Sequence, residues 1–199
     1  TYTYDCPYVG IGYMAGPRAS VTIDGDRAYA LGAMGHIHCL DAASGDVHWK
    51  RDLNRELPID MPEWGIAASP LIHENLVILH IGGRQGACIV ALDKKSGNEK
   101  WRALDEKASY SAPIIVQQAG SPVVIAWTGE SLSGIDASTG EVHWRFSFPP
   151  SRMPIGIATP IVDGNRVYVS SFYDGSLMVD LDPDRLAAKK VWSAVGRNE

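Results

Sequence analysis

The residues of this chain that could do chemistry fall into short clusters, and the first has the spacing of a dinucleotide-binding loop. Gly10, Gly12 and Ala15 match a Gly-x-Gly-x-x-Gly/Ala pattern. Such a loop needs a helix directly behind it, because the helix N-terminus holds the pyrophosphate. Here Gly16, Pro17 and a strand-like run follow. The spacing therefore does not predict a dinucleotide site.

The second cluster pairs two histidines with a cysteine. His36 and His38 fall on one face of a predicted strand, and Cys39 points to the other face. Metal sites in proteins need three or four ligands. Two histidines without a third ligand favour a half-exposed strand face over a metal site.

The third cluster imitates the start of a calcium-binding loop with Asp180, Asp182 and Asp184. That loop needs Gly at its sixth position and Glu at its twelfth, where this chain has Arg185 and Val191. The aspartates are therefore predicted to cap a long turn. We predict no metal-ligating residue.

Catalytic motifs are missing from the sequence. There is no Gly-x-Ser-x-Gly elbow, His-Glu-x-x-His zinc motif or P-loop. Cys6, Cys39 and Cys88 form no Cys-x-x-Cys pair and no disulfide framework. We predict no catalytic residue.

Composition limits the class of protein further. With 199 residues and 45% hydrophobic content the chain can bury a core. The balance of 18 basic against 23 acidic residues, a net charge of −5, argues against a nucleic-acid partner. No run reaches the roughly 18 apolar residues of a membrane span. The first residues carry neither an initiator Met nor a signal sequence, so we expect a piece of a longer chain.

A repeat decides the fold class. The pattern Asp-x-x-x-Gly-x-x-x-Trp occurs three times, at Asp41–Trp49, Asp93–Trp101 and Asp136–Trp144. A degenerate fourth copy, without the Gly, runs from Asp182 to Trp192. Between the copies lie short apolar strands separated by Asp-Gly and Gly-rich turns, which are typical of hairpins. Four-stranded antiparallel units that repeat every 40–50 residues or so indicate an all-β fold, the β-propeller.

The repeat also divides the chain. We predict four blades at residues 17–54, 55–106, 107–149 and 150–199, preceded by the end of an earlier blade and a link at 1–16. Thr1–Asp5 is interpreted as the outer strand of that earlier blade. A half-ring follows from this orphan strand, and a closed four-bladed ring is the alternative.

The repeat residues have a structural explanation. The Asp side chain accepts backbone N–H bonds in the turn, and Gly45, Gly97 and Gly140 permit a positive φ. Each tryptophan is expected to dock on the next blade at a small residue such as Ala91 or Gly134. The tryptophans assigned to blade docking, in place of cofactor stacking, are Trp49, Trp101, Trp144 and Trp192.

The turn resembles the tryptophan-docking motif of the pyrroloquinoline-quinone (PQQ)-like repeat propellers, approximately Ala-x-Asp-x-x-Thr-Gly-x-x-x-Trp. Ala91–Trp101 and Gly134–Trp144 follow it, with Ser96 in place of Thr in the first. The resemblance runs from about residue 16 to the end. It implies a parent ring of seven or eight blades and a periplasmic or extracytoplasmic location. The family includes PQQ-dependent alcohol dehydrogenases, the propeller lipoprotein of the outer-membrane barrel-assembly machinery and sensor domains of bacterial serine/threonine kinases.

The long links between blades carry the candidate binding residues. In a propeller such links gather on one face, and exposed aromatic residues with Arg suit recognition of a protein or small ligand. Ordinary packing of the links is the alternative. The residues assigned to this candidate partner or ligand face are Tyr13, Arg18, Trp64, Tyr110 and Arg152.

These observations favour a non-catalytic binding or assembly scaffold without a cofactor. The alternatives are a quinoprotein dehydrogenase or the sensor propeller of a kinase. For the dehydrogenase the resemblance implies PQQ and calcium beside an adjacent Cys pair, and the sequence has no adjacent cysteines. A half-ring would expose apolar flanks that need the remaining blades of the parent chain or a second copy. We expect the chain alone to dimerise, aggregate or be unstable.

Overall fold

The computed structural model describes residues 2–13 and 16–194, which form four separate four-stranded sheets with one short helix, α1 (Leu53–Glu56). The first sheet contains β1 (Thr22–Asp24), β2 (Arg27–Leu31), β3 (His36–Asp41) and β4 (Val47–Asp52). The second contains β5 (Leu71–His73), β6 (Leu76–His80), β7 (Ile89–Asp93) and β8 (Glu99–Ala103). The third contains β9 (Ile114–Gln118), β10 (Ser121–Trp127), β11 (Ser131–Asp136) and β12 (Val142–Ser147). The fourth contains β13 (Ile161–Asp163), β14 (Arg166–Ser171), β15 (Gly175–Leu181) and β16 (Ala188–Ala194).

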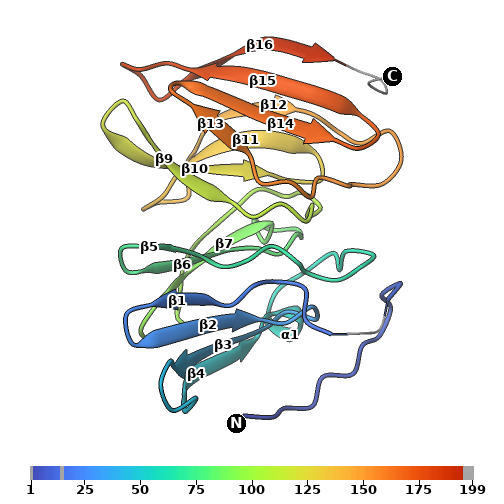
Figure 1. Ribbon diagram of the computed structural model, residues 1–199, viewed down its shortest axis with the longest axis vertical. Helices are drawn as coiled ribbons and strands as arrows, with labels where there is room; N and C mark the ends of the chain where they lie inside the picture. The colour runs from blue at the N-terminus through green and yellow to red at the C-terminus, as the bar shows by residue number, and fades with distance from the viewer. Residues whose placement is uncertain (1, 14–15, 195–199) are drawn as a thin grey trace.

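Each sheet is an antiparallel meander in which consecutive strands pair, as a propeller blade requires. The blades stack in chain order, with the first and fourth at opposite ends of the stack (Figure 1). They therefore do not close on one another. The predicted β-propeller with four blades is confirmed, and the closed four-bladed ring is wrong.

Three apolar cores hold neighbouring blades together. Side chains alternate between the two faces of a strand, so a middle strand serves two cores. Val77 and Leu79 of β6 lie in the core with the first blade, and Ile78 lies in the core with the third. Val123 and Ile125 of β10 belong to the core with the fourth blade. These strands are apolar on both faces because each face contributes to a different core.

Tryptophan side chains form hydrogen bonds between the first and second blades and between the second and third blades. The indole Nε1 of Trp49 donates to the carbonyl oxygen of Lys94 at 3.1 Å, and that of Trp101 donates to Ala137 at 3.1 Å. Each acceptor lies in the Asp-to-Gly turn of the next blade. A Cβ at Gly97 would lie 2.7 Å from the ring of Trp49. The turn glycine is therefore needed for the approach of the indole as well as for its φ of +73°.

The expectation that Ala91 and Gly134 receive the indole of another blade was wrong. Ala91 pairs with Trp101 across β7 and β8, and Gly134 pairs with Trp144 across β11 and β12. A Cβ at Gly134 would lie 2.2 Å from the ring of Trp144. These small residues make room for the indole of their own blade as it lies over the neighbouring strand.

The third junction uses a side chain as a bridge, because the turn of the fourth blade lacks the glycine. Trp144 Nε1 donates to Gln118 Oε1 at 3.1 Å. The Gln118 amide nitrogen lies 3.4, 3.1 and 2.6 Å from the carbonyl oxygens of Asp182, Arg185 and Ala187. Gln118 is buried at the end of β9. The side-chain amide thus replaces the direct bond from indole to turn.

The turn aspartates bond as predicted. Asp41 Oδ1 accepts the N–H groups of Ala43 and Ser44 at 3.1 and 2.7 Å, and Asp93 and Asp136 repeat the pattern. These bonds from Ser44 hold the pKa of Asp41 below its usual value. Asp182 Oδ1 accepts the N–H groups of Asp184 and Arg185 in the same way, at 3.0 and 3.2 Å, so it caps its own turn.

The terminal segments differ from the prediction. Thr1 lies outside the described residues, and Tyr2–Asp5 form no strand. The rings of Tyr2 and Tyr4 instead pack on His38, with centroids 5.3 and 4.4 Å away. They cover part of the free face of the first blade. At the other end of the stack Trp192 is 40% exposed.

Candidate functional site

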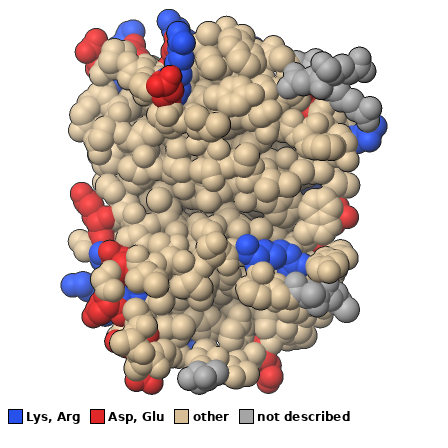
Figure 2. All heavy atoms as spheres, in the orientation of Figure 1, with Lys and Arg blue, Asp and Glu red and all other residues tan. Residues whose placement is uncertain are grey.

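All links between blades emerge at one end of the strands. Each blade has four antiparallel strands, so the chain leaves a blade at the end where it entered. The links between blades are residues 53–70, 104–113 and 148–160, and residues 16–21 lead into the first blade. The three links between blades lie mainly to the right in Figure 1. We call this surface the link face. Figure 2 shows the same view, in which charged side chains lie mainly toward the margins where strands end in turns and links.

Three successive links line one groove on the link face, with a volume of about 280 Å³. We call it the link groove. It is lined by residues 60–64, by Lys107, Ala108 and Tyr110, and by residues 152–154. Trp64, Tyr110 and Arg152, which the sequence placed on the candidate binding face, therefore meet in a single groove.

Trp64 and Tyr110 form the aromatic centre of the link groove. Their ring centroids are 5.5 Å apart, and the backbone N–H of Trp64 donates to the Tyr110 hydroxyl at 3.4 Å. The Tyr110 N–H donates to the Gly156 carbonyl at 2.8 Å, which ties the link of the third blade to that of the fourth. Gly12 donates to the Glu63 carbonyl at 2.6 Å, beside Trp64. Burial raises the pKa of Tyr110, so its hydroxyl stays protonated at neutral pH.

The other predicted residues lie at or beyond the rim. The Arg152 guanidinium is exposed and lies 5.3 Å from the ring centre of Tyr173. Arg18 donates to the carbonyl of Tyr13, outside the groove lining. Tyr13 is 66% exposed. Tyr13 and Arg18 therefore do not line the link groove, although the charge of Arg18 acts on Tyr110 and opposes the rise of its pKa. Ala15, of the nucleotide-loop pattern, lies outside the described residues.

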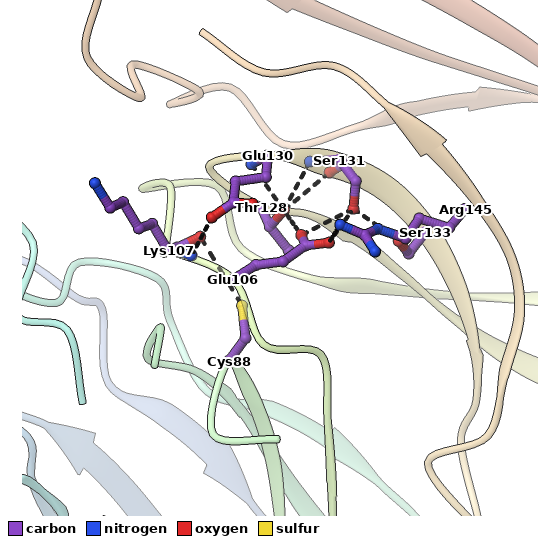
Figure 3. Close-up of polar contacts among 8 residues, drawn as sticks. All are labelled: Cys88, Glu106, Lys107, Thr128, Glu130, Ser131, Ser133 and Arg145. Carbon is purple, nitrogen blue, oxygen red and sulfur yellow. Dashed lines mark hydrogen bonds and ion pairs between the residues drawn. The ribbon is translucent and has the colours of Figure 1, made fainter. Parts of the chain in front are cut away.

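A buried carboxylate that the sequence did not reveal anchors the link of the third blade (Figure 3). Glu106 is 2% exposed and forms an ion pair with Arg145 of β12. The Ser131 hydroxyl lies 3.0 and 2.9 Å from its two carboxylate oxygens, and Thr128 also donates to it. Glu106 directly precedes Lys107 of the groove. Fixing Glu106 therefore fixes Lys107 and the chain that leads to Tyr110.

One signal in the sequence could have pointed to this network. Ser131 and Ser133 alternate with apolar residues, so their hydroxyls lie on the same buried face of β11. Buried hydroxyls need partners, and Ser131 and Ser133 are 2.9 Å apart. The pattern predicts a polar partner for these hydroxyls, but it does not identify Glu106 as that partner.

The carboxylates near the link groove do not fit a quinone with its calcium ion. Glu106 is already paired with Arg145, and Asp60 lies 3.5 Å from Arg84. Calcium needs six to eight oxygen ligands, several of them carboxylates free to turn toward the ion. Within residues 2–13 and 16–194 no group of three His, Cys, Asp or Glu could hold a metal.

The cysteines and histidines of the second cluster also lie in packed surroundings. Cys39 and Cys88 are buried and unpaired, and Cys6 Sγ lies 3.5 Å from His36 Nδ1. Burial lowers the pKa of His38 to about 4, so this ring is neutral at pH 7. In the part of the chain that the structure describes, no helix is long and apolar enough to span a membrane.

Comparison with known protein families gives a match over residues 12–198 to the family described as outer membrane protein assembly factor BamB. Two curated proteins are similar over parts of the chain. The serine/threonine-protein kinase AfsK of Streptomyces griseus is 29% identical over 109 residues, covering 53% of this chain and 13% of that protein. The 1-butanol dehydrogenase (quinone) of Thauera butanivorans is 28% identical over 157 residues, covering 75% of this chain and 24% of that protein.

Solved structures share the fold. BamB from Moraxella catarrhalis matches with a TM-score of 0.65 and 20% identity, over 92% of this chain and 55% of that one. The quinohemoprotein alcohol dehydrogenase ADHIIG from Pseudomonas putida HK5 matches with a TM-score of 0.59 and 21% identity, over 90% and 34%. The computationally designed Ika4 protein matches with a TM-score of 0.53 and 11% identity, over 84% and 94%. The chain thus spans about half of the Moraxella structure and a quarter or less of the two curated relatives.

Proposed function

The chain belongs to the BamB family of PQQ-like repeat propellers, and on that premise we propose that it is a non-catalytic scaffold that binds a segment of a partner protein in the link groove. The family name refers to outer membrane protein assembly, which sets the expected class of partner as a protein and the expected location as extracytoplasmic. The blades supply a rigid frame, and the links supply the contacts.

The link groove is the observation that carries this proposal. It brings Trp64, Tyr110 and Arg152 together from three successive links. Tryptophan, tyrosine and arginine are the residue types that most often dominate binding energy at protein interfaces. The two rings are half-buried and held by backbone hydrogen bonds, so little conformational entropy is lost when a partner binds.

The test is a selection from a phage-displayed library of random 12-residue peptides on the immobilised chain. Selected peptides are expected to bind the original chain and to lose about 30-fold in affinity with Trp64→Ala, which corresponds to about 2 kcal/mol. Arg152→Ala, at an exposed position, should also weaken binding. Trp192→Ala is the control, since this tryptophan is exposed on the fourth blade, away from the groove.

Thermal melting of each variant establishes that it is folded. If no selected peptide distinguishes the original chain from folded Trp64→Ala and Arg152→Ala, the proposal is wrong.

The enzymatic alternative rests on the similarity to 1-butanol dehydrogenase (quinone). It is tested by adding PQQ and calcium chloride and following the reduction of a redox dye with 1-butanol. The scaffold proposal predicts no dye reduction above that of PQQ and calcium alone. Dye reduction that depends on the chain would contradict the scaffold proposal and favour a quinoprotein dehydrogenase.

A further inference from the structure

The two sides of the link groove differ in charge. The link into the second blade contributes Asp60 and Glu63. The links into the third and fourth blades contribute Lys107 and Arg152. The blades are stacked in chain order (Figure 1), so charge changes from negative to positive along the stack. The aromatic pair of Trp64 and Tyr110 lines the same groove and joins the links into the second and third blades.

From this polarity we infer that the bound segment is a dipolar peptide, with one large apolar side chain between a basic and an acidic residue. The inference rests on the proposed function and adds the chemistry of the partner. The apolar side chain lies against the aromatic pair. The basic residue lies toward the second blade and the acidic residue toward the fourth.

The charges on both sides face solvent and are available to a partner. Glu63 and Lys107 are exposed, and neither side chain forms an ion pair within residues 2–13 and 16–194. The Arg152 side chain is exposed, and its guanidinium carbon lies 5.3 Å from the ring centre of Tyr173. Asp60 already lies 3.5 Å from Arg84, so Glu63 is the main acidic contact for an incoming cation.

The middle of the groove suits a single large apolar side chain. Met61 and Met153 line it together with Trp64 and Tyr110. Methionine is flexible and makes favourable contacts with aromatic rings. A volume of about 280 Å³ is at the small end of ligand pockets, which hold drug-sized molecules at roughly 300–1,000 Å³. One phenylalanine or leucine side chain fits that space better than a large cofactor.

Peptides of uniform charge match the groove less well. An acidic peptide meets Glu63, and a basic peptide meets Lys107 and Arg152, so each places like charges together. A dipolar peptide satisfies both sides. It can do so in either chain direction, because the groove is matched by side-chain charge and not by backbone polarity.

The experiment measures fluorescence anisotropy with three fluorescein-labelled heptapeptides at 50 mM NaCl. Their sequences are Lys-Lys-Gly-Phe-Gly-Glu-Glu, Glu-Glu-Gly-Phe-Gly-Glu-Glu and Lys-Lys-Gly-Phe-Gly-Lys-Lys. The dipolar peptide is expected to bind about fivefold more tightly than either uniform peptide. The difference should shrink at 1 M NaCl, where the Debye length is about 3 Å.

A charge reversal gives the matched variant. Glu63→Lys makes the rim basic on both sides, so the acidic peptide should become the tightest binder. Glu141→Lys makes the same change in charge at an exposed position in the turn before β12, away from the link face. It should leave the order of affinities unchanged. This gain of preference cannot arise from misfolding.

The outcomes separate the two proposals. Equal affinities for the three peptides, or an order that Glu63→Lys does not change, would overturn the dipolar inference. The same holds if none of the three binds while library-selected peptides still depend on Trp64, because the groove then binds a segment of another composition. If no peptide of either kind depends on Trp64, the proposed function fails as well.

Discussion

The indole nitrogen of Trp49 donates a hydrogen bond to the carbonyl of Lys94, 45 residues further along the chain. This bond joins the outer strand of one blade to the turn of the next. Trp101 repeats it with Ala137. The repeat residues therefore serve the architecture, and the residues available for binding are those of the links.

Glycine in the turn is predicted to matter for contact with the indole as well as for backbone freedom. Gly97→Ala and Gly25→Ala both place a side chain at positive φ, which costs about 1–2 kcal/mol. Only at Gly97 would the new Cβ lie 2.7 Å from the ring of Trp49, whereas Gly25 has no atom within 4 Å. Urea denaturation should show Gly97→Ala to be less stable than Gly25→Ala by at least about 1 kcal/mol. Equal losses would contradict the role of Gly97 in docking.

The bridging amide at the third junction gives a second prediction. Gln118→Leu leaves the buried Trp144 N–H without a partner and removes the amide bonds to the carbonyls of Arg185 and Ala187, which each keep one backbone N–H donor. The expected loss of unfolding free energy is about 2–3 kcal/mol, because unpaired buried polar groups are costly. Gln117→Leu is the control, since Gln117 is the exposed neighbour. A loss no larger than that of the control in chemical denaturation would mean that the bridge is not important for stability.

The buried carboxylate should hold the third link in place. Glu106→Gln removes the charge that pairs with Arg145, and we expect a loss of about 1–3 kcal/mol. Glu99→Gln removes a comparable ion pair with Arg102, at 2.9 Å, but both side chains are about one-third exposed. That change should cost less than about 1 kcal/mol. Peptide affinity should fall with Glu106→Gln and stay constant with Glu99→Gln. The opposite order in calorimetry and anisotropy would refute the anchoring role.

Acid should destabilise the fold through His80. Burial lowers the pKa of His80 to about 4, and its Nδ1 lies 3.0 Å from the Ser111 carbonyl. The unfolded ring has a pKa near 6.5, so the unfolded chain binds this proton first as the pH falls. The contribution of neutral His80 to the unfolding free energy is complete above about pH 6.5. It is lost progressively down to about pH 4, by roughly 3 kcal/mol.

A neutral replacement checks the source of that pH dependence. His80→Leu should reduce the fall in unfolding free energy between pH 7 and 4.5 without abolishing it, because His38, whose pKa is also lowered to about 4, still contributes. His48→Leu, at an exposed position of β4, should leave it unchanged. An identical slope in both variants would assign the acid sensitivity to other groups.

Local pattern was enough to predict the blades and a shared face for the links, but not the groove that joins Trp64, Tyr110 and Arg152. Turn chemistry and a regular repeat define four antiparallel strands, and an even number of strands returns every link to one face. The pairing of Ala91 with Trp101 was misassigned because a repeat shows that a small residue is needed but not which indole it meets. Gln118 and Glu106 were not found, since each bonds residues of other strands or turns that no local pattern connects.

Hydrogen exchange with and without a library-selected peptide tests whether the links, and not the docking turns, form the binding surface. We expect bound peptide to slow amide exchange in the links at 53–70, 104–113 and 148–160, including the Tyr110 N–H that bonds Gly156. The Asp-to-Gly turns at 41–45, 93–97 and 136–140 should exchange at unchanged rates. Protection at those turns, with none in the links, would contradict this expectation.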